Sequence, residues 1–305
     1  MRRSLIIQKP IIMLLMANII GFSLLFLYKQ PYDYRILIVG LSISIVCILS
    51  YTLLKYFSLG DEYLFLTISM LSSIGVIMLY RLNQELGLKQ IIWLLFGILL
   101  FFAAYFIYSK ITFWNRLMYF YFSVAMILFL STLLLGKNIK GATNWIVIAG
   151  HSIQPAEFIK ILFIFFIASY YIHPESIKPI NIRIFKKYIT IKSQYIFMVL
   201  SYIFMGFLVL QKEWGTALLF FLIYFALLYS FERSKTVLLV NTLPAIIGGI
   251  GGYLLVYHIK VRIETWLNPW KDIANKGYQI TQSLFAIGAG DFFGRGIGLG
   301  NPEFI

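Results

Sequence analysis

The chain has 305 residues, of which 60% are hydrophobic and 12% are charged, and its formal net charge is +14. A soluble domain carries about 25% charged residues, so this composition excludes an ordinary soluble protein and indicates one that lies in a bilayer. The basic residues are scattered among apolar segments, so anionic lipid headgroups or an anionic lipid-linked substrate fit the charge better than nucleic acid does.

Nine apolar segments follow one another along the chain, and each is long enough to cross a membrane as a helix of about 20 residues. The first follows the basic start MRRSLIIQKP without a small-residue cleavage site, so we predict a retained helix and not a cleaved signal peptide. The runs are continuously apolar, which favours helices over barrel strands. The predicted spans are residues 11–28, 36–57, 63–80, 90–108, 114–135, 157–173, 194–211, 215–231 and 236–257.

The fold class that follows is all-α: a polytopic membrane helical bundle of about nine transmembrane helices, with a glycine-rich re-entrant or extracytoplasmic segment after them. Orientation comes from basic residues, because loops rich in Lys and Arg stay cytoplasmic. We expect the loop between the sixth and seventh spans inside, and by alternation the N-terminus inside and the segment from about His258 outside. The basic residues of that loop are Lys178, Arg183, Lys186, Lys187 and Lys192.

The first polar segment is the loop from Gly136 to Lys160. Pro155 suits the first turn of a helix, and Glu157 just behind it complements the helix dipole. Lys160 lies three residues further on the same face, so the two side chains can pair. An ion pair at the edge of a bilayer is costly unless it faces a polar cavity, so we predict a cavity wall here; a simple helix cap is the alternative for Glu157.

Two more polar segments follow. Gln211 to Ala217 joins the seventh and eighth spans, and its Glu213 is most simply a helix cap. The stretch from Asn268 to Ile305 is polar and glycine-rich, and its six glycines from Gly288 to Gly300 exclude a long regular helix there and let backbone approach backbone or a ligand closely. Asp272 and Asp291 lie in this stretch, and acids are scarce in this chain, so the stretch suggests a working surface. The alternatives are a flexible re-entrant connector for the glycine run and a turn or cap residue for Asp291. No metal motif is present, because the three histidines lack ligand spacing.

These three segments, in this order, resemble the SEDS family (shape, elongation, division and sporulation), whose members include RodA, FtsW and SpoVE. The family pattern G-x4-GA-x-RW…QPSE-x2-K is similar to Gly136, Gly141-Ala142, Trp145, Gln154-Pro155-Ala156-Glu157 and Lys160. QPDLGTA is similar to Gln211–Ala217, and NPxxDPxGxGYQxxQSxxAIGxGGxxGxGxG is similar to Asn268–Gly300. The stretch Met78–Trp93 resembles the family's first helical hairpin. The resemblance places two additional helices in residues 1–60 and the family core in residues 61–305.

The resemblance implies a glycosyltransferase, a peptidoglycan polymerase that joins lipid II units outside the cytoplasmic membrane and works with a class B penicillin-binding protein. Asp272 matches the family's essential acid, and we expect it to be the base that deprotonates the acceptor hydroxyl. Lys160, Arg262 and Lys271 are candidates for the substrate diphosphate, a role that a divalent cation such as Mg²⁺ or Mn²⁺ could share. The remaining matched substrate-binding candidates are Gln154, Glu157, Gln282 and Ser283.

The chain departs from the family pattern at several positions. Asn144 stands where an arginine is usual, which removes an expected phosphate or headgroup contact, and Lys212-Glu213-Trp214 replaces Pro-Asp-Leu. Asp291 replaces a glycine. Family members continue beyond the equivalent of Ile305 through further helices, so the chain is expected to be the front part of such a protein. A flippase for the lipid-linked precursor, and a non-catalytic scaffold for a transpeptidase, are the alternative functions.

Overall fold

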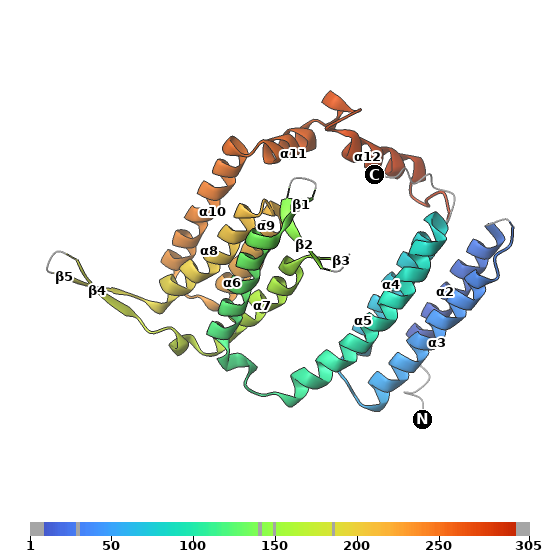
Figure 1. Ribbon diagram of the computed structural model, residues 1–305, viewed down its shortest axis with the longest axis horizontal. Helices are drawn as coiled ribbons and strands as arrows, with labels where there is room; N and C mark the ends of the chain where they lie inside the picture. Colours follow the sequence, from blue (N-terminus) through green and yellow to red (C-terminus); the bar gives the residue numbers. More distant parts are fainter. Residues whose placement is uncertain (1–8, 29–30, 140–141, 149–150, 185–186, 297–305) are drawn as a thin grey trace. The chain divides into compact units, whose positions relative to one another are not determined.

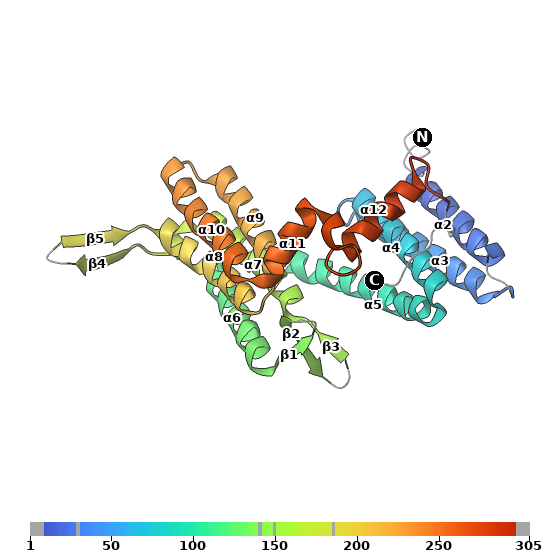
Figure 2. The ribbon, with the colours of Figure 1, turned by 90° about the horizontal axis from the view of Figure 1, so that it is seen from above.

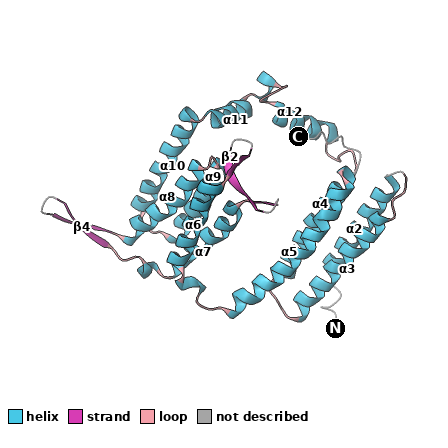
Figure 3. Ribbon diagram, in the orientation of Figure 1, coloured by secondary structure: helices cyan, strands magenta, loops and turns pink. Residues whose placement is uncertain are grey.

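The computed structural model describes residues 9–28, 31–139, 142–148, 151–184 and 187–296. Helices dominate these ranges, and strands occur in two loops (Figure 3). Nine of the described helices are long and apolar enough to span a membrane, which confirms the predicted multi-pass helical fold. The chain divides into two compact units, Met1–Lys110 with Glu264–Ile305, and Ile111–Ile263.

The first unit contains four spans, and their order along the chain is shown in Figure 1. They are α2 (Lys9–Tyr28), α3 (Arg35–Tyr56), α4 (Glu62–Leu82) and α5 (Gln84–Lys110). Helix α2 packs on α3 and α4, and α4 pairs with α5. Their shared core is apolar and includes Leu14, Phe22, Ile36, Ile43, Val76 and Tyr80.

A tight turn joins α4 to α5. Asn83 separates the two helices, and its Oδ1 accepts the backbone N–H groups of Glu85 (2.9 Å) and Leu86 (3.3 Å), which are two of the donors that a helix start leaves without an internal partner. Gly87 lies against Tyr80, where a Cβ atom would come within 2.7 Å of the Tyr80 Cα. A glycine is therefore required for the two helices to approach this closely.

The loop before α3 is fastened to this turn by Asp33. Its Oδ2 accepts from the Tyr80 hydroxyl (3.0 Å) and from the Gln84 amide (2.8 Å), while Oδ1 accepts from the Arg35 backbone N–H (3.0 Å). These bonds connect the two N-terminal helices, predicted as an addition, to the hairpin predicted as the start of the family core.

Replacing Asp33 by alanine should lower the unfolding free energy by about 2 kcal/mol, because three donors lose a charged acceptor. Asp33→Asn keeps an acceptor oxygen at the same position and should lose less than half of that. Thermal unfolding of the detergent-purified protein checks the order parent, Asn, Ala. Equal midpoints for parent and Asp33→Ala would contradict it.

The second unit is built from five spans. They are α6 (Met118–Leu135), α7 (Pro155–Ile172), α8 (Ser193–Leu210), α9 (Trp214–Phe231) and α10 (Lys235–Leu255), and a short 3-10 turn, η1 (Trp114–Arg116), precedes α6. Aromatic rings fill the centre: Phe163 stacks on Phe220 with ring centroids 4.3 Å apart, and Tyr170 stacks on Phe197 at 3.7 Å. Such pairs add about 0.5–1.5 kcal/mol each beyond burial.

Pro244 interrupts the hydrogen bonds of α10, since it has no backbone N–H and crowds the preceding turn. The buried Asn241, one turn earlier, connects α10 to its neighbours. The Tyr202 hydroxyl of α8 donates to the Asn241 backbone oxygen, and the Tyr224 hydroxyl of α9 donates to Asn241 Oδ1 at 2.6 Å. The interrupted helix is thus held by polar contacts from both sides.

Two loops of this unit form small sheets at opposite ends of the bundle. Strands β1 (Lys137–Ile139), β2 (Ala142–Ile148) and β3 (His151–Ile153) form an antiparallel sheet between α6 and α7. Strands β4 (Ile180–Ile184) and β5 (Lys187–Ile191) form a hairpin between α7 and α8 (Figure 2), after the short turn η2 (Pro174–Ser176). Helix α7 has 18 residues, so its two ends lie about 27 Å apart.

The remaining elements follow α10. Helix α11 (Tyr257–Leu267) leads to the 3-10 turn η3 (Pro269–Asp272) and then to α12 (Tyr278–Gly290). Helix α12 ends where the glycine-rich run continues, as the composition predicts. Residues 297–305, the last part of the motif-like stretch, lie outside the described residues.

Candidate functional site

The turn between α8 and α9 holds a buried polar cluster in the second unit. Gln211 is almost fully buried, and its amide donates to the Phe129 backbone oxygen (3.2 Å) on α6. The Glu213 backbone N–H donates to the Leu208 oxygen at 2.8 Å, and this bond folds the chain back over the end of α8. The turn therefore carries Glu213 inward, and its side chain is only 8% exposed.

The Glu213 carboxylate collects two amides from the β-sheet loop. Asn144 Nδ2, on β2, and Gln154 Nε2, just before α7, both donate to Glu213 Oε1. Glu213 occupies the predicted N-cap position of α9, but its side chain makes no cap bond there and turns to the β-sheet loop instead. The cluster brings the first and second polar segments of the sequence to the same end of the bundle, opposite the β4–β5 hairpin.

Two acceptor atoms of this cluster are buried without a hydrogen-bond partner among the described residues, Glu213 Oε2 and Asn144 Oδ1. All the amide donors point to the other carboxylate oxygen. Buried acceptors without a donor are costly, so this end of the bundle favours a neighbour that carries a hydrogen-bond donor. Asn144 therefore packs inside the fold and is not available for the phosphate contact that the family arginine implies.

Glu157 and Lys160 form the predicted pair at the start of α7. Their Oε1 and Nζ atoms lie 2.7 Å apart, and α7 begins at Pro155 as predicted. The Glu157 side chain is 59% exposed and that of Lys160 is 32% exposed, so both are accessible at the helix end. Gln154 precedes them and is engaged with Glu213, which positions the helix start.

Lys212 adopts a left-handed backbone conformation with φ of +62°. This is the position where the family pattern has proline, and proline is restricted to φ near −65°, so the turn here differs from that of a proline-containing relative. A non-glycine residue in this region costs about 1–2 kcal/mol.

Lys212→Gly should therefore raise the unfolding free energy by about 0.5–1 kcal/mol, because glycine adopts this conformation without strain. Lys192→Gly is the matched control, since Lys192 has φ of −66° and gains nothing from glycine. The measurement is the thermal midpoint in detergent. A fall in stability for both variants alike would show that Lys212 is not strained.

Asp272 ends the turn η3 in the C-terminal part of the first unit. Its side chain is half-buried, and Oδ1 accepts from the Asn275 amide (3.1 Å) while the Lys276 backbone N–H lies 3.5 Å from Oδ2. The Asp272 backbone oxygen accepts from the Gly277 N–H at 2.8 Å. The carboxylate is thus oriented by its own turn and remains partly accessible to a ligand.

Gly277 is what allows this turn to close. A Cβ atom at this position would come within 2.2 Å of the Pro269 oxygen and 2.8 Å of the Asp272 oxygen. Both contacts are with backbone, which cannot move aside easily. The glycine of the matched motif is therefore a structural requirement of the loop that presents Asp272.

The other predicted residues vary in their surroundings. Lys271, next to Asp272, is exposed, and Arg262 is exposed on α11. On α12, Gln282 is half-buried, whereas the Ser283 hydroxyl donates to the Gln279 backbone oxygen (2.8 Å) and so bonds within its own helix.

Asp291 is the C-cap of α12 with φ of +50°. Glycine suits a position with positive φ, and the cap position agrees with the turn role expected for Asp291.

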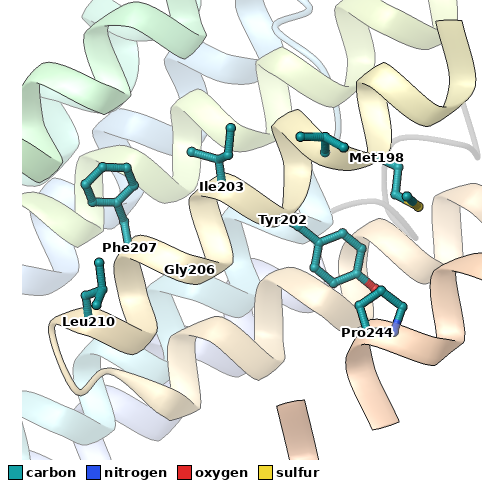
Figure 4. Close-up of a pocket in the computed structure, with 8 residues that line it drawn as sticks. Met198, Tyr202, Ile203, Gly206, Phe207, Leu210 and Pro244 are labelled. Carbon is teal, nitrogen blue, oxygen red and sulfur yellow. The ribbon is translucent and has the colours of Figure 1, made fainter. Parts of the chain in front are cut away.

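An apolar groove of about 530 Å³ runs along α8 in the second unit (Figure 4). The Tyr202 ring points toward Pro244, beside the interrupted segment of α10. Gly206 widens the groove because it carries no side chain. The lining is otherwise apolar and consists of Met198, Val199, Tyr202, Ile203, Gly206, Phe207, Leu210 and Pro244.

Metal-ligating side chains do not gather in the part of the chain that the structure describes: no group of three His, Cys, Asp or Glu residues occurs there.

Comparison with known proteins places these observations in a family. The family model described as FTSW_RODA_SPOVE, cell cycle protein, matches residues 56–305. The peptidoglycan glycosyltransferase RodA of Mycobacterium tuberculosis is 28% identical over 261 residues, which cover 80% of this chain and 55% of the relative. The probable peptidoglycan glycosyltransferase FtsW of Tolumonas auensis is 32% identical over 175 residues, which cover 57% of this chain and 43% of the relative.

One solved structure is also similar, a chain from work described as "Structural coordination of polymerization and crosslinking by a peptidoglycan synthase complex". It has a TM-score of 0.47 and 22% identity, and the match covers 87% of this chain and 67% of that chain. This chain spans about half the length of the curated relatives it matches.

Proposed function

Since the chain belongs to the FtsW/RodA/SpoVE family of cell-cycle proteins, we propose that it polymerises peptidoglycan glycan strands. It joins lipid II units at the outer face of the bacterial cytoplasmic membrane, during elongation, division or sporulation. The observation that carries this proposal is the loop of Asp272, in which a turn closed by Gly277 holds a partly accessible carboxylate.

The chemistry needs one proton acceptor and a means of stabilising negative charge. The acceptor hydroxyl of one sugar attacks the anomeric carbon of another, a C–O bond forms, and the bond to the diphosphate breaks. Asp272 takes the hydroxyl proton as general base, which contributes about 10²–10⁴-fold to a rate. The diphosphate leaves with its negative charge and needs no proton.

Cationic side chains are the natural partners of that leaving diphosphate. Lys271 is exposed beside Asp272, and Arg262 and Lys160 are accessible on α11 and α7. Arginine binds phosphate oxygens with a planar fork of donors, whereas lysine acts as a point charge. A divalent cation held by Asp272 and the phosphates would add Lewis-acid stabilisation of the same charge.

The polyprenyl tail needs an apolar surface, which helices long and apolar enough to cross a membrane offer. Holding two lipid-linked sugars in one orientation removes much of the entropic cost of their reaction. The N-terminus is cytoplasmic in this proposal, and a class B penicillin-binding protein cross-links the strands that the chain makes. Flippase and scaffold functions are the alternatives that the test distinguishes.

The test uses the full gene product, purified and reconstituted into vesicles with fluorescent lipid II. Polymerase activity predicts a ladder of glycan products on a gel, without a need for transfer across the bilayer. Transfer of lipid II between leaflets with no ladder would favour the flippase. Neither activity, together with retained binding of a transpeptidase, would favour the scaffold.

A further inference from the structure

Helix α11 begins where a membrane span ends. Helix α10 ends at Leu255, Val256 follows in extended backbone (φ −114°, ψ 104°), and α11 begins at Tyr257. The chain changes direction between the two helices (Figure 1). Helix α11 has 11 residues and is about 16 Å long, too short to cross a hydrocarbon core of about 30 Å. It therefore either extends into water or lies along the membrane surface.

One side of α11 is a continuous apolar stripe. Successive residues of a helix are rotated by about 100°, so Ile259, Ile263 and Trp266, at spacings of four and three, lie on the same side. Leu267 lies four residues after Ile263 and extends that side. The stripe covers about 100° of the helix surface, a width typical of a helix side that meets an apolar environment.

Charged residues lie beside the stripe and not within it. Lys260 and Glu264 follow one edge, and Arg262 follows the other. Long basic side chains can lay their stems on an apolar surface while their charged ends stay among polar headgroups. Tryptophan on an apolar side with basic residues next to it is the composition of helices that lie in a membrane interface.

The exposure of side chains on α11 is the reverse of that of a helix in a soluble domain. Trp266 is 73% exposed and Leu267 is 69% exposed, although both belong to the apolar stripe. Thr265 is buried, although it lies on nearly the opposite side from Ile263. A helix in water buries its apolar side, because exposing apolar surface to water is unfavourable. The exposed stripe therefore requires an apolar covering.

The stripe continues the apolar surface of the preceding span. Gly252 on α10 leaves room for Ile259, since a Cβ atom at Gly252 would lie 3.2 Å from Ile259 Cδ1. The start of the stripe thus packs against the span. Leu254 and Leu255, at the end of the same span, are exposed as well. Lipid covers the exposed side chains of a membrane span, so lipid is the occupant that this continuity favours.

We propose that α11 lies along the membrane surface at which α10 ends, with Ile263, Trp266 and Leu267 among the acyl chains of the lipids. The turn η3 begins at Pro269, two residues after α11 ends, so the membrane holds the Asp272 carboxylate near the depth of the lipid headgroups. The diphosphate of a lipid-linked sugar lies at this depth. That consequence rests on the proposed function, whereas the membrane contact of α11 does not.

The test compares spin labels on opposite sides of α11. The chain has one cysteine, Cys47, which is buried, so Cys47→Ser supplies the background. Leu267→Cys places a label on the stripe, and His258→Cys, nine residues earlier, places a matched label about 180° away on the helix surface. Both positions are exposed. Each labelled full chain is placed in phosphatidylcholine nanodiscs. Electron paramagnetic resonance then measures the accessibility of the label to oxygen, which concentrates among acyl chains, and to a water-soluble nickel chelate.

We expect the ratio of oxygen to nickel accessibility to be at least about threefold higher for the Leu267→Cys label than for the His258→Cys label, because an interfacial helix buries its apolar side in the acyl boundary. Ile263→Cys, one turn earlier on the same side, should behave like Leu267→Cys, which excludes a local effect of one substitution. Equal ratios on the two sides of α11 would overturn the proposal, since the helix then extends into water. Shielding of both stripe labels from oxygen and nickel alike would also overturn it, because protein then covers the stripe.

Discussion

Asp272→Asn is expected to lower the rate of glycan polymerisation by about 10²–10⁴-fold, the usual contribution of a general base. Asparagine has the same shape but cannot accept the proton of the attacking hydroxyl. Its Oδ1 can still accept the Asn275 amide, so the turn that ends η3 should persist. The loss should therefore appear in the chemical step and not in the fold.

Single-turnover kinetics with fluorescent lipid II separate these effects. We expect the rate of glycosyl transfer to fall while lipid II binding stays unchanged within about threefold, because only a transition-state interaction is removed. A variant that binds lipid II far more weakly, but transfers what it binds at the parent rate, would make Asp272 a substrate ligand and not the base.

Glu213→Ala should have the largest effect on stability, a loss of about 2–4 kcal/mol in unfolding free energy. The substitution removes the acceptor for the amides of Asn144 and Gln154, and a buried donor left unpaired costs about 1–3 kcal/mol. The β1–β3 loop should separate from the α8–α9 turn. Hydrogen exchange of the β2 and β3 backbone should then increase, which a thermal midpoint alone would not show.

Two variants serve as controls for Glu213. Glu213→Gln keeps one oxygen for the amides and should lie between parent and Ala. Glu157→Ala removes an exposed ion pair on the same end of the bundle and should cost no more than about 1 kcal/mol. If Glu157→Ala destabilised the protein as strongly as Glu213→Ala, the buried cluster would not be what holds the loop.

The membrane helices were predictable because lipid selects for long apolar runs with every backbone group bonded internally. The predicted and observed spans differ at the ends of the helices. The fifth span was predicted to begin at residue 114, but Trp114–Arg116 form a 3-10 turn and α6 begins at Met118. The Tyr121 hydroxyl donates to the Trp114 backbone oxygen (2.8 Å), a contact that composition does not encode.

The contacts of the candidate site that join residues close together in the sequence were predictable. Glu157 and Lys160 pair at the i, i+3 spacing of a helix, which sequence reveals directly. Asn144 and Glu213 are 69 residues apart, and their contact depends on how α6, α8 and the β-sheet loop pack. The signal that could have paired them is that both positions depart from the family pattern, an arginine and an aspartate there becoming an asparagine and a glutamate here.

Backbone conformation accounts for two further departures from the pattern. Lys212 and Asp291 stand where relatives have proline and glycine, and both have positive φ values, +62° and +50°. A sequence does not state φ, so the replacement of proline by lysine does not by itself reveal the different turn. At Asp291 the structure supports a turn role for an acid that might otherwise compete with Asp272 for the chemistry.

The most direct test of the central claim compares these two acids in one polymerisation assay. The full gene product, its Asp272→Asn variant and its Asp291→Asn variant are given the same lipid II, and glycan chains are measured on a gel. We expect chains from the parent and from Asp291→Asn at similar rates, and almost none from Asp272→Asn. Chains from Asp272→Asn at the parent rate would contradict it.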